Sequence, residues 1–258
     1  MGSVVKWGRC LFAAAFIGFG VLHFVFTRSG RPAPGIIPWL PDSTIPWMAY
    51  ITGAAFLAVG ICIALNKRAR LAALFLGILL LLFALSLELP RVIENPLNVS
   101  LRTVLFEVLA FCGAALILSG TQTSGSSSFG LGKRRASSFT LFGRYIFAIS
   151  LLVFGIDHYI SRARVSSLVP AWIPGSGMFW TYFTGIAFIA AGMSIATGIL
   201  ARWGAFMIGL MFLLWFLVLH SPRVVKLPAF HNPAEWSSAF IALGMCGASW
   251  IVAWYFVD

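Results

Sequence analysis

The chain has 258 residues, of which 60% are apolar and only 10% are charged, and its mean hydropathy is +0.95. A soluble domain cannot hide that much apolar surface, so these values exclude the soluble classes. The formal net charge of +11 fits basic residues at membrane boundaries and attraction to anionic lipid, and we expect no nucleic-acid binding.

Eight apolar stretches are each about long enough to cross ~30 Å of hydrocarbon as a helix. We expect the first at 7–26 and interpret it as a retained helix, because no small-residue cleavage site follows it. The sequence therefore predicts an all-α, polytopic membrane protein with both termini on one side. The remaining spans are expected at 47–65, 71–89, 103–119, 139–160, 178–200, 203–219 and 236–256.

Short motifs recur in the same order in the two halves of the chain. Their spacing drifts only from 132 to 137 residues, which chance does not produce. We predict a four-helix repeat at 1–119, a Ser/Gly-rich basic linker at 120–138 and a second repeat at 139–258, forming two parallel-repeat four-helix bundles. The matching residues include Gly8-Arg9 and Gly143-Arg144, His23 and His158, Trp39 and Trp172, Gly53 and Gly185, Pro90-Arg91 and Pro222-Arg223, and Cys112 and Cys246.

Basic residues in short loops predict the orientation of the spans. The positive-inside rule places the side that is richer in Lys and Arg in the cytoplasm. We therefore expect both termini to be cytoplasmic, and the opposite side is called the outer side below. The basic residues on the cytoplasmic side are Lys6, Arg9, Lys67, Arg68, Arg70, Lys133, Arg134, Arg135, Arg144 and Arg202.

The order of the motifs resembles the DoxX family of membrane proteins. Gly-Arg opens the first helix, G-x-x-H ends it, and Pro-Arg follows the third helix. In the first outer loop the second half has P-x-W-x-P, where the first half has Pro38-Trp39-Leu40-Pro41. Family members are typically single four-helix units, so this chain resembles a tandem fusion. The resemblance implies a bacterial inner (plasma) membrane subunit that interacts with quinone, which is not covalently bound, and with a thiosulfate- or thiol-oxidising redox partner.

Polar side chains gather at the outer helix ends and in the outer loops. Because placing polar groups in or next to a bilayer costs free energy, their position indicates where a functional site can lie. A ligand site at this level, between the two repeats, is one hypothesis. The alternative is that these side chains only cap helices and solvate the interface. The candidate ligand-binding residues are His23, His158, His220, His231, Glu88, Glu94, Asp157, Arg91 and Arg223.

The two copies differ in an informative way at this level. The first half has Glu88 and Glu94 where the second has His220 and His231. A Glu–His pair can hold and relay a proton, as a quinone site requires, and the arginines can bind an oxyanion. A zinc site from the two histidines is a further alternative, but no metal-ligand spacing supports it, so we predict no metal.

Three more residues complete the set of candidates. Glu107 is a carboxylate within the fourth span, where the second repeat has Ile241, and it serves either a site or an ion pair. Trp39 and Trp172 belong either to an interfacial aromatic belt or to a pocket for a quinone ring or lipid.

Three functions are open from the sequence. The first is a redox subunit with quinone and a partner protein. The second is a transporter or binding protein for a small molecule or lipid, and the third is a non-catalytic scaffold in an oligomer or complex. The sequence does not decide whether the chain is itself an enzyme, because a distant eukaryotic relative of the DoxX family is a cargo receptor.

Overall fold

The computed structural model describes residues 2–28, 46–121, 138–226 and 233–256. Eight helical spans within them are long and apolar enough to cross a membrane, which confirms the predicted all-α polytopic membrane protein. They are Lys6–Thr27, Trp47–Ala64, Ala69–Glu94, Val99–Thr121, Ser138–Ile160, Gly177–Thr197, Ala201–Lys226 and Ala234–Tyr255.

The four spans of each half follow one another in the same order. A π-helical turn (η) and a short helix extend the third span of each half, and the second half has one further short helix, α7, after its first span. The first half contains α1 (Gly2–Arg28), α2 (Pro46–Ala64), α3 (Ala69–Phe83), η1 (Ala84–Glu88), α4 (Leu89–Glu94) and α5 (Val99–Thr121). The second contains α6 (Ser138–Ile160), α7 (Arg162–Leu168), α8 (Gly177–Thr197), α9 (Ala201–Leu214), η2 (Trp215–His220), α10 (Ser221–Lys226) and α11 (Pro233–Tyr255).

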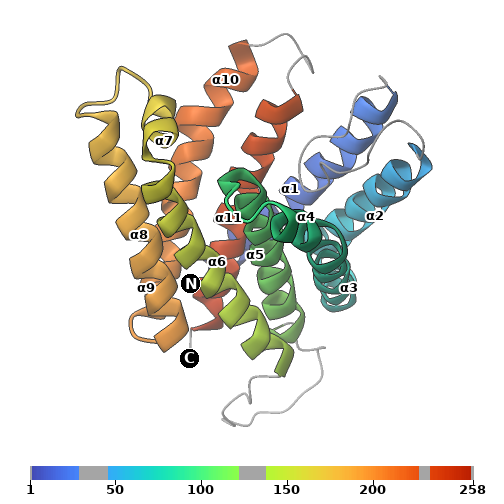
Figure 1. Cartoon of the computed structure of the whole chain (residues 1–258). Helices are drawn as coiled ribbons and strands as arrows, with labels where there is room; N and C mark the ends of the chain where they lie inside the picture. The colour runs from blue at the N-terminus through green and yellow to red at the C-terminus, as the bar shows by residue number, and fades with distance from the viewer. Residues whose placement is uncertain (1, 29–45, 122–137, 227–232, 257–258) are drawn as a thin grey trace.

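The long helices form a closed ring in chain order (Figure 1). Each contacts the next, α5 contacts α6 across the linker, and α11 returns to α1. A further contact between α5 and α11 crosses the middle of the ring and divides the molecule into two lobes. Lobe one is enclosed by α1, α2, α3, α5 and α11, and lobe two by α6, α8, α9, α11 and α5.

Reciprocal glycine crossings join the two halves. A Cβ on Gly8 of α1 would lie 3.3 Å from the Gly247 carbonyl oxygen on α11, and one on Gly143 of α6 would lie 2.5 Å from the Gly113 carbonyl oxygen on α5. Such close approach through small residues is how membrane helices gain packing contacts. The first helix of each half therefore packs on the last helix of the other half, so the two repeats interlock.

Matching crossings also occur inside each half. A Cβ on Gly20 of α1 would lie 2.8 Å from the Gly53 carbonyl oxygen on α2, and one on Gly155 of α6 would lie 2.8 Å from the Gly185 carbonyl oxygen on α8. In each crossing an early residue of one helix meets a late residue of its neighbour, so neighbouring helices run in opposite directions. Because directions alternate around the ring and α6 is four places after α1, these two helices run in the same direction.

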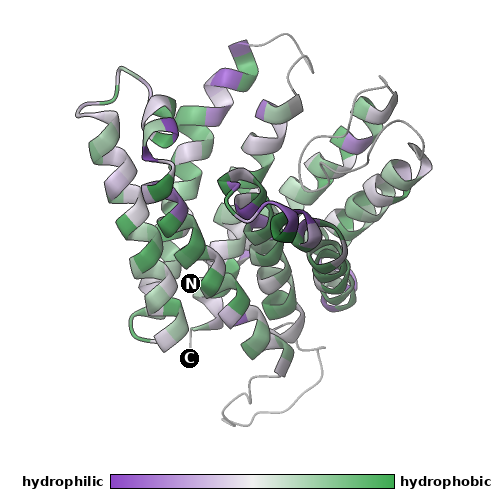
Figure 2. Ribbon diagram, viewed as in Figure 1, coloured by the Kyte–Doolittle hydropathy of each residue, from purple (hydrophilic) through white to green (hydrophobic). Residues whose placement is uncertain are grey.

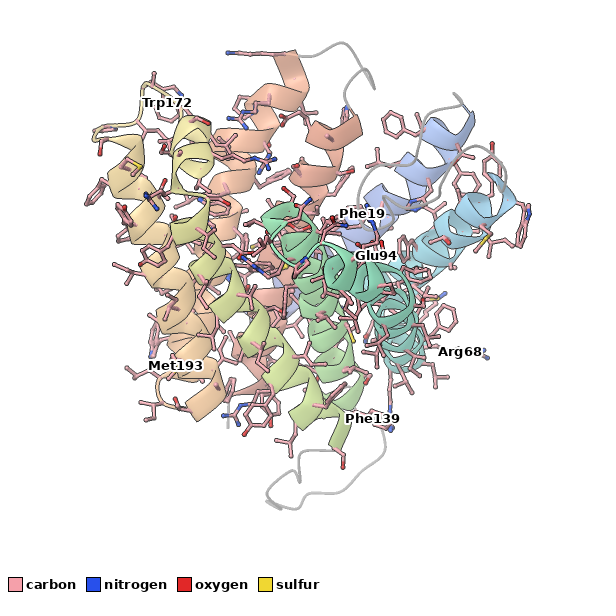
Figure 3. The ribbon with its side chains drawn as sticks, in the orientation of Figure 1. Phe19, Arg68, Glu94, Phe139, Trp172 and Met193 are labelled. Atoms are coloured by element: carbon pink, nitrogen blue, oxygen red, sulfur yellow. The ribbon has the colours of Figure 1, made fainter. Side chains whose placement is uncertain are left out.

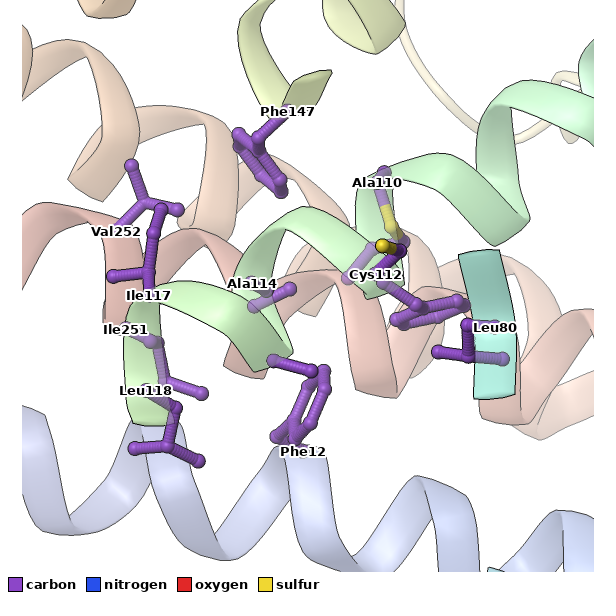
Figure 4. Close-up of a cluster of buried hydrophobic side chains, with 14 of the residues drawn as sticks. Phe12, Leu80, Ala110, Cys112, Ala114, Ile117, Leu118, Phe147, Ile251 and Val252 are labelled. Atoms are coloured by element: carbon purple, nitrogen blue, oxygen red, sulfur yellow. The ribbon is translucent and has the colours of Figure 1, made fainter. Parts of the chain in front are cut away.

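The centre of the molecule is the α5–α11 pair. The buried share of the apolar window is 61% in α5 and 67% in α11, but 22% in the α9–α10 span. Figure 4 shows this core around α5, where Cys112 and Ile117 pack with Phe147 of α6 and Ile251 of α11. Hydrophilic segments are confined mainly to helix ends, including α4, α7 and α10 (Figure 2). The outward faces of the middle segments are apolar and suit lipid contact.

A π-helical turn precedes a proline in each half. The Leu89 N–H donates to the Ala84 carbonyl before Pro90, and the Ser221 N–H donates to the Phe216 carbonyl before Pro222. A proline ring clashes with the carbonyl four residues earlier in an α-helix, and the wider π turn moves that carbonyl away. The sequence predicts that these spans end at 89 and 219, whereas the helices continue to Glu94 and Lys226.

The interlocked contacts predict that neither half folds as a stable monomer alone. We expect the fragments 1–121 and 138–258 to co-purify as a 1:1 complex when they are expressed together with different tags. Each fragment alone should aggregate or self-associate, because its first helix lacks the partner that the other half supplies. Size-exclusion chromatography in detergent checks this, and a stable monomer of either half would contradict the exchange of helices.

Candidate functional site

His23 lies near the outer end of α1 with only 1% of its surface exposed. Its Nδ1 is 2.7 Å from the carbonyl oxygen of Phe19. Because a carbonyl oxygen only accepts, Nδ1 carries the proton of the neutral ring and Nε2 is left as an acceptor. Nε2 is buried and has no hydrogen-bond partner among the residues that the structure describes. It is therefore available to accept a hydrogen from a bound group.

Glu88 ends the π turn η1, and its side chain is fully buried. Its Oε2 is 3.2 Å from Nη1 of Arg91, while Oε1 has no hydrogen-bond partner within the described part of the chain. Glu107 of α5 lies near enough to interact electrostatically with Glu88. If both carboxyl groups were ionised, Arg91 would offset only one of the two charges. A bound proton or a ligand that donates hydrogen bonds would offset the rest.

A series of aromatic ring contacts runs from His23 of α1 to α5. His23 meets Phe56 edge-on at 5.6 Å between ring centroids, Phe56 meets Phe16 at 5.3 Å, and Phe16 meets Phe111 of α5 at 5.5 Å. Phe111 follows Glu107 by four residues, so the two share one face of α5. These ring contacts therefore link His23 of α1 to the face of α5 that carries Glu107. We call His23, Glu88, Arg91 and Glu107 the lobe-one cluster.

Lobe two has an equivalent cluster of different composition. His158 repeats the geometry of His23, with Nδ1 2.8 Å from the Phe154 carbonyl oxygen, and its ring stacks on Trp215 at 5.9 Å. Where lobe one has Glu88, lobe two has His220, whose Nδ1 is 3.9 Å from Oε2 of Glu235 on α11. We call His158, His220, Arg223 and Glu235 the lobe-two cluster.

Asp157 belongs to neither cluster, because it forms an ion pair between the halves. Its Oδ1 accepts from Nε of Arg102 on α5 at 2.8 Å and also from Nη2 of Arg102, and its Oδ2 accepts from the Thr103 hydroxyl at 3.1 Å. The Asp157 side chain is 5% exposed and that of Arg102 is 23% exposed. The sequence predicts Asp157 as a candidate but does not predict Arg102 as its partner, because Arg102 has no matching arginine in the second half.

The repeated arginines at the side opposite the outer side bind groups at or just beyond helix ends. Nη1 of Arg9 donates to Oδ1 of Asn66 just after α2, at 2.7 Å. Arg144 donates from Nε and Nη2 to the Ile195 and Ala196 carbonyls near the end of α8, at 2.8 and 2.9 Å. Carbonyls at a helix C-terminus lack helical partners, so Arg144 caps α8, whereas Arg9 binds the Asn66 side chain just beyond the end of α2.

The remaining predicted candidates lie apart from the clusters or outside the described residues. Glu94 is exposed at the end of α4, and Trp172 is 70% exposed in the loop after α7 (Figure 3). Arg223 belongs to the lobe-two cluster, and its Nη2 donates to the Leu168 carbonyl at 2.9 Å, which joins α10 to the end of α7. Trp39 and His231 lie outside the described residues, and so does the alternative zinc site from His220 and His231.

Glu235 was absent from the candidate site residues although it faces His220. The signal that could have identified it is its position in the first turn of the last span, opposite the end of the third. Among the described residues, no three His, Cys, Asp or Glu side chains are placed to hold a metal ion.

Comparison with known proteins gives one match. A family model described as a domain of unknown function (DUF8561) matches residues 147–236. The match covers less than half of the chain. It begins in α6 and ends at the start of α11, so it includes His158, His220 and Glu235 of the lobe-two cluster. No curated protein and no solved structure matches the chain.

The buried ion pair between the halves predicts a large effect on stability. Asp157→Asn should cost roughly 3 kcal/mol in detergent, because it leaves the Arg102 charge buried without its partner. Removing both charges in Arg102→Leu with Asp157→Leu should cost less than the single change. Arg164→Ala, which removes an exposed hydrogen bond to Ser100, is the control and should change little. Equal stability of Asp157→Asn and the unaltered protein would contradict a structural ion pair.

Proposed function

We propose that this chain is a DoxX-like membrane subunit that binds quinone at the lobe-one cluster and works with a redox partner protein. The observation that carries the proposal is that two buried acceptors of the lobe-one cluster, Oε1 of Glu88 and Nε2 of His23, have no hydrogen-bond partner among the described residues. Buried polar atoms without partners are rare in native structures, and a ligand is one explanation. The motif order of the two halves supports the same family.

The chemistry of the cluster suits the reduced form of such a ligand. A quinol presents hydroxyl groups that donate hydrogen bonds, and both unpartnered atoms accept them. Glu88 and Glu107 can hold a proton between them, since two nearby carboxylates with one arginine favour partial protonation. Phe16, Phe56 and Phe111 offer aromatic faces and edges for a ring. The partner, a thiosulfate- or thiol-oxidising protein at the outer side, donates two electrons to the quinone, which takes up two protons and leaves as quinol.

Replacement of Glu88 tests this proposal. Glu88→Gln should lower the quinone retained after purification in mild detergent by roughly 10- to 100-fold, because a hydrogen bond to a charged group contributes about 1.5–3 kcal/mol. Lipid extraction with quantification of quinone per protein is the measurement. Glu94→Gln, a carboxylate exposed six residues away, is the matched control. Retention of quinone in a folded Glu88→Gln protein would exclude the lobe-one cluster as its site.

A second candidate function is binding or transport of an amphipathic cation. The observation that favours it is the excess of carboxylates over arginines in the lobe-one cluster, which would attract a positive charge. Binding of a lipophilic cation such as tetraphenylphosphonium, lost in Glu88→Gln while no quinone co-purifies, would replace the quinone proposal. Absence of both ligands would favour the scaffold.

We also propose that both termini face the cytoplasm of a bacterial inner membrane. Two exposed loop positions at opposite ends of the spans provide a matched test: Leu97, 92% exposed between α4 and α5, and Ile199, 71% exposed between α8 and α9. In a background with Cys10 and Cys62 replaced by Ala, Leu97→Cys should react with a membrane-impermeant maleimide in intact cells, and Ile199→Cys should react only after lysis. The opposite pattern would reverse the topology.

A further inference from the structure

Two polar side chains, His220 and Glu235, lie side by side at the outer end of lobe two without a direct hydrogen bond between them. Nδ1 of His220 and Oε2 of Glu235 are 3.9 Å apart, and both atoms are buried without a hydrogen-bond partner among the residues described. The side chains themselves are 14% and 26% exposed, so the pair lies close to the surface of the protein. A direct hydrogen bond would need about 2.7–3.2 Å. One oxygen atom placed beside the pair can be about 2.8 Å from both atoms.

The two atoms have complementary hydrogen-bonding roles. Glu235 lies in the first turn of α11, where the helix dipole and free N–H groups stabilise a carboxylate. A carboxylate accepts hydrogen bonds, whereas an imidazole nitrogen can donate or accept according to its tautomer. Arg223, three residues after His220, adds a positive charge next to the ring. A group that accepts from the imidazole and donates to the carboxylate would satisfy both atoms, and a hydroxyl does both.

The surroundings indicate how such a hydroxyl would arrive. Leu217 and Leu214, about one and two turns before His220, are 52% and 50% exposed on the apolar surface of the span. These side chains face the lipid, so the pair lies beside a route along the hydrocarbon. An amphipathic molecule could place its hydroxyl between His220 and Glu235 and leave its apolar body in the membrane. Lobe one has Glu88 in place of His220, so the same donor–acceptor pair does not form there.

We propose that His220 and Glu235 form a second ligand site, in lobe two, which holds the hydroxyl group of a lipid-soluble alcohol or phenol. The Nδ1–H of His220 donates to the hydroxyl oxygen, and the hydroxyl donates to Oε2 of Glu235. The site does not rest on quinone binding in lobe one, because it uses different residues on different helices.

A pair of matched probes tests the hydroxyl directly in the unaltered protein. 1-Naphthol and 1-methoxynaphthalene share the aromatic body, but only the first can donate to Glu235. Equilibrium dialysis against the full-length protein in detergent should show naphthol binding at least about tenfold more tightly, as expected when an ether leaves a buried carboxylate unpaired. Equal affinities would overturn the proposal, since binding would then need only the apolar body.

Variants then locate the site. Glu235→Leu and His220→Phe should each lower naphthol affinity by about tenfold or more, whereas His220→Gln, which keeps a donor, should retain part of it. Glu94→Leu is the control for removing an outer carboxylate and should bind as the unaltered protein does. Thermal stability in detergent identifies variants that do not fold, and the comparison of the two probes needs no variant. Loss of naphthol binding in Glu88→Gln, with full binding in Glu235→Leu, would move the probe to lobe one and overturn the proposal.

Discussion

The close backbone contact between the first helix of each half and the last helix of the other determines the arrangement of this protein. In a membrane, helices gain little from burying apolar surface against each other, so close packing through small residues carries much of their association. Gly8 against Gly247 and Gly143 against Gly113 provide that packing twice. Each crossing includes one helix of the central pair, α11 or α5, and these two helices form the common wall of both lobes.

This wall also positions the polar side chains. Arg102 and Thr103 of α5 bind Asp157 of α6, Glu107 of α5 meets Glu88, and Glu235 of α11 faces His220. Most of the buried polar groups have partners, as membrane proteins require. Within the described residues, four of the six side chains with a buried atom that lacks a partner belong to the two clusters: His23, Glu88, His220 and Glu235. The cost of an unpaired buried atom, about 1–3 kcal/mol, makes these positions the ones that a ligand would stabilise most.

Much of this fold can be predicted from the sequence, because length and hydropathy define membrane spans and the ordered motifs define matching helices. The exchange of helices cannot, because Gly113 and Gly247 are equivalent in the sequence and either could pack on Gly8. The π turns cannot be predicted for a different reason. A proline within a helical pattern normally marks a helix end, and only the structure shows the wider turns before Pro90 and Pro222 that let both helices continue. Side-chain partners such as Arg102 for Asp157 depend on the same exchanged contacts.

The exchanged contacts have a consequence for how such a chain can diversify. A single four-helix unit with these contacts would need a second, identical copy to cover its first helix, and a pair of identical units must carry identical sites. Joining the two units in one chain fixes their stoichiometry and removes that constraint of identity. One lobe can then specialise without disturbing the other, as the carboxylate at position 88 and the imidazole at the matching position 220 illustrate. Two units joined in one chain can therefore carry two different outer surfaces, which a symmetric dimer of identical units cannot.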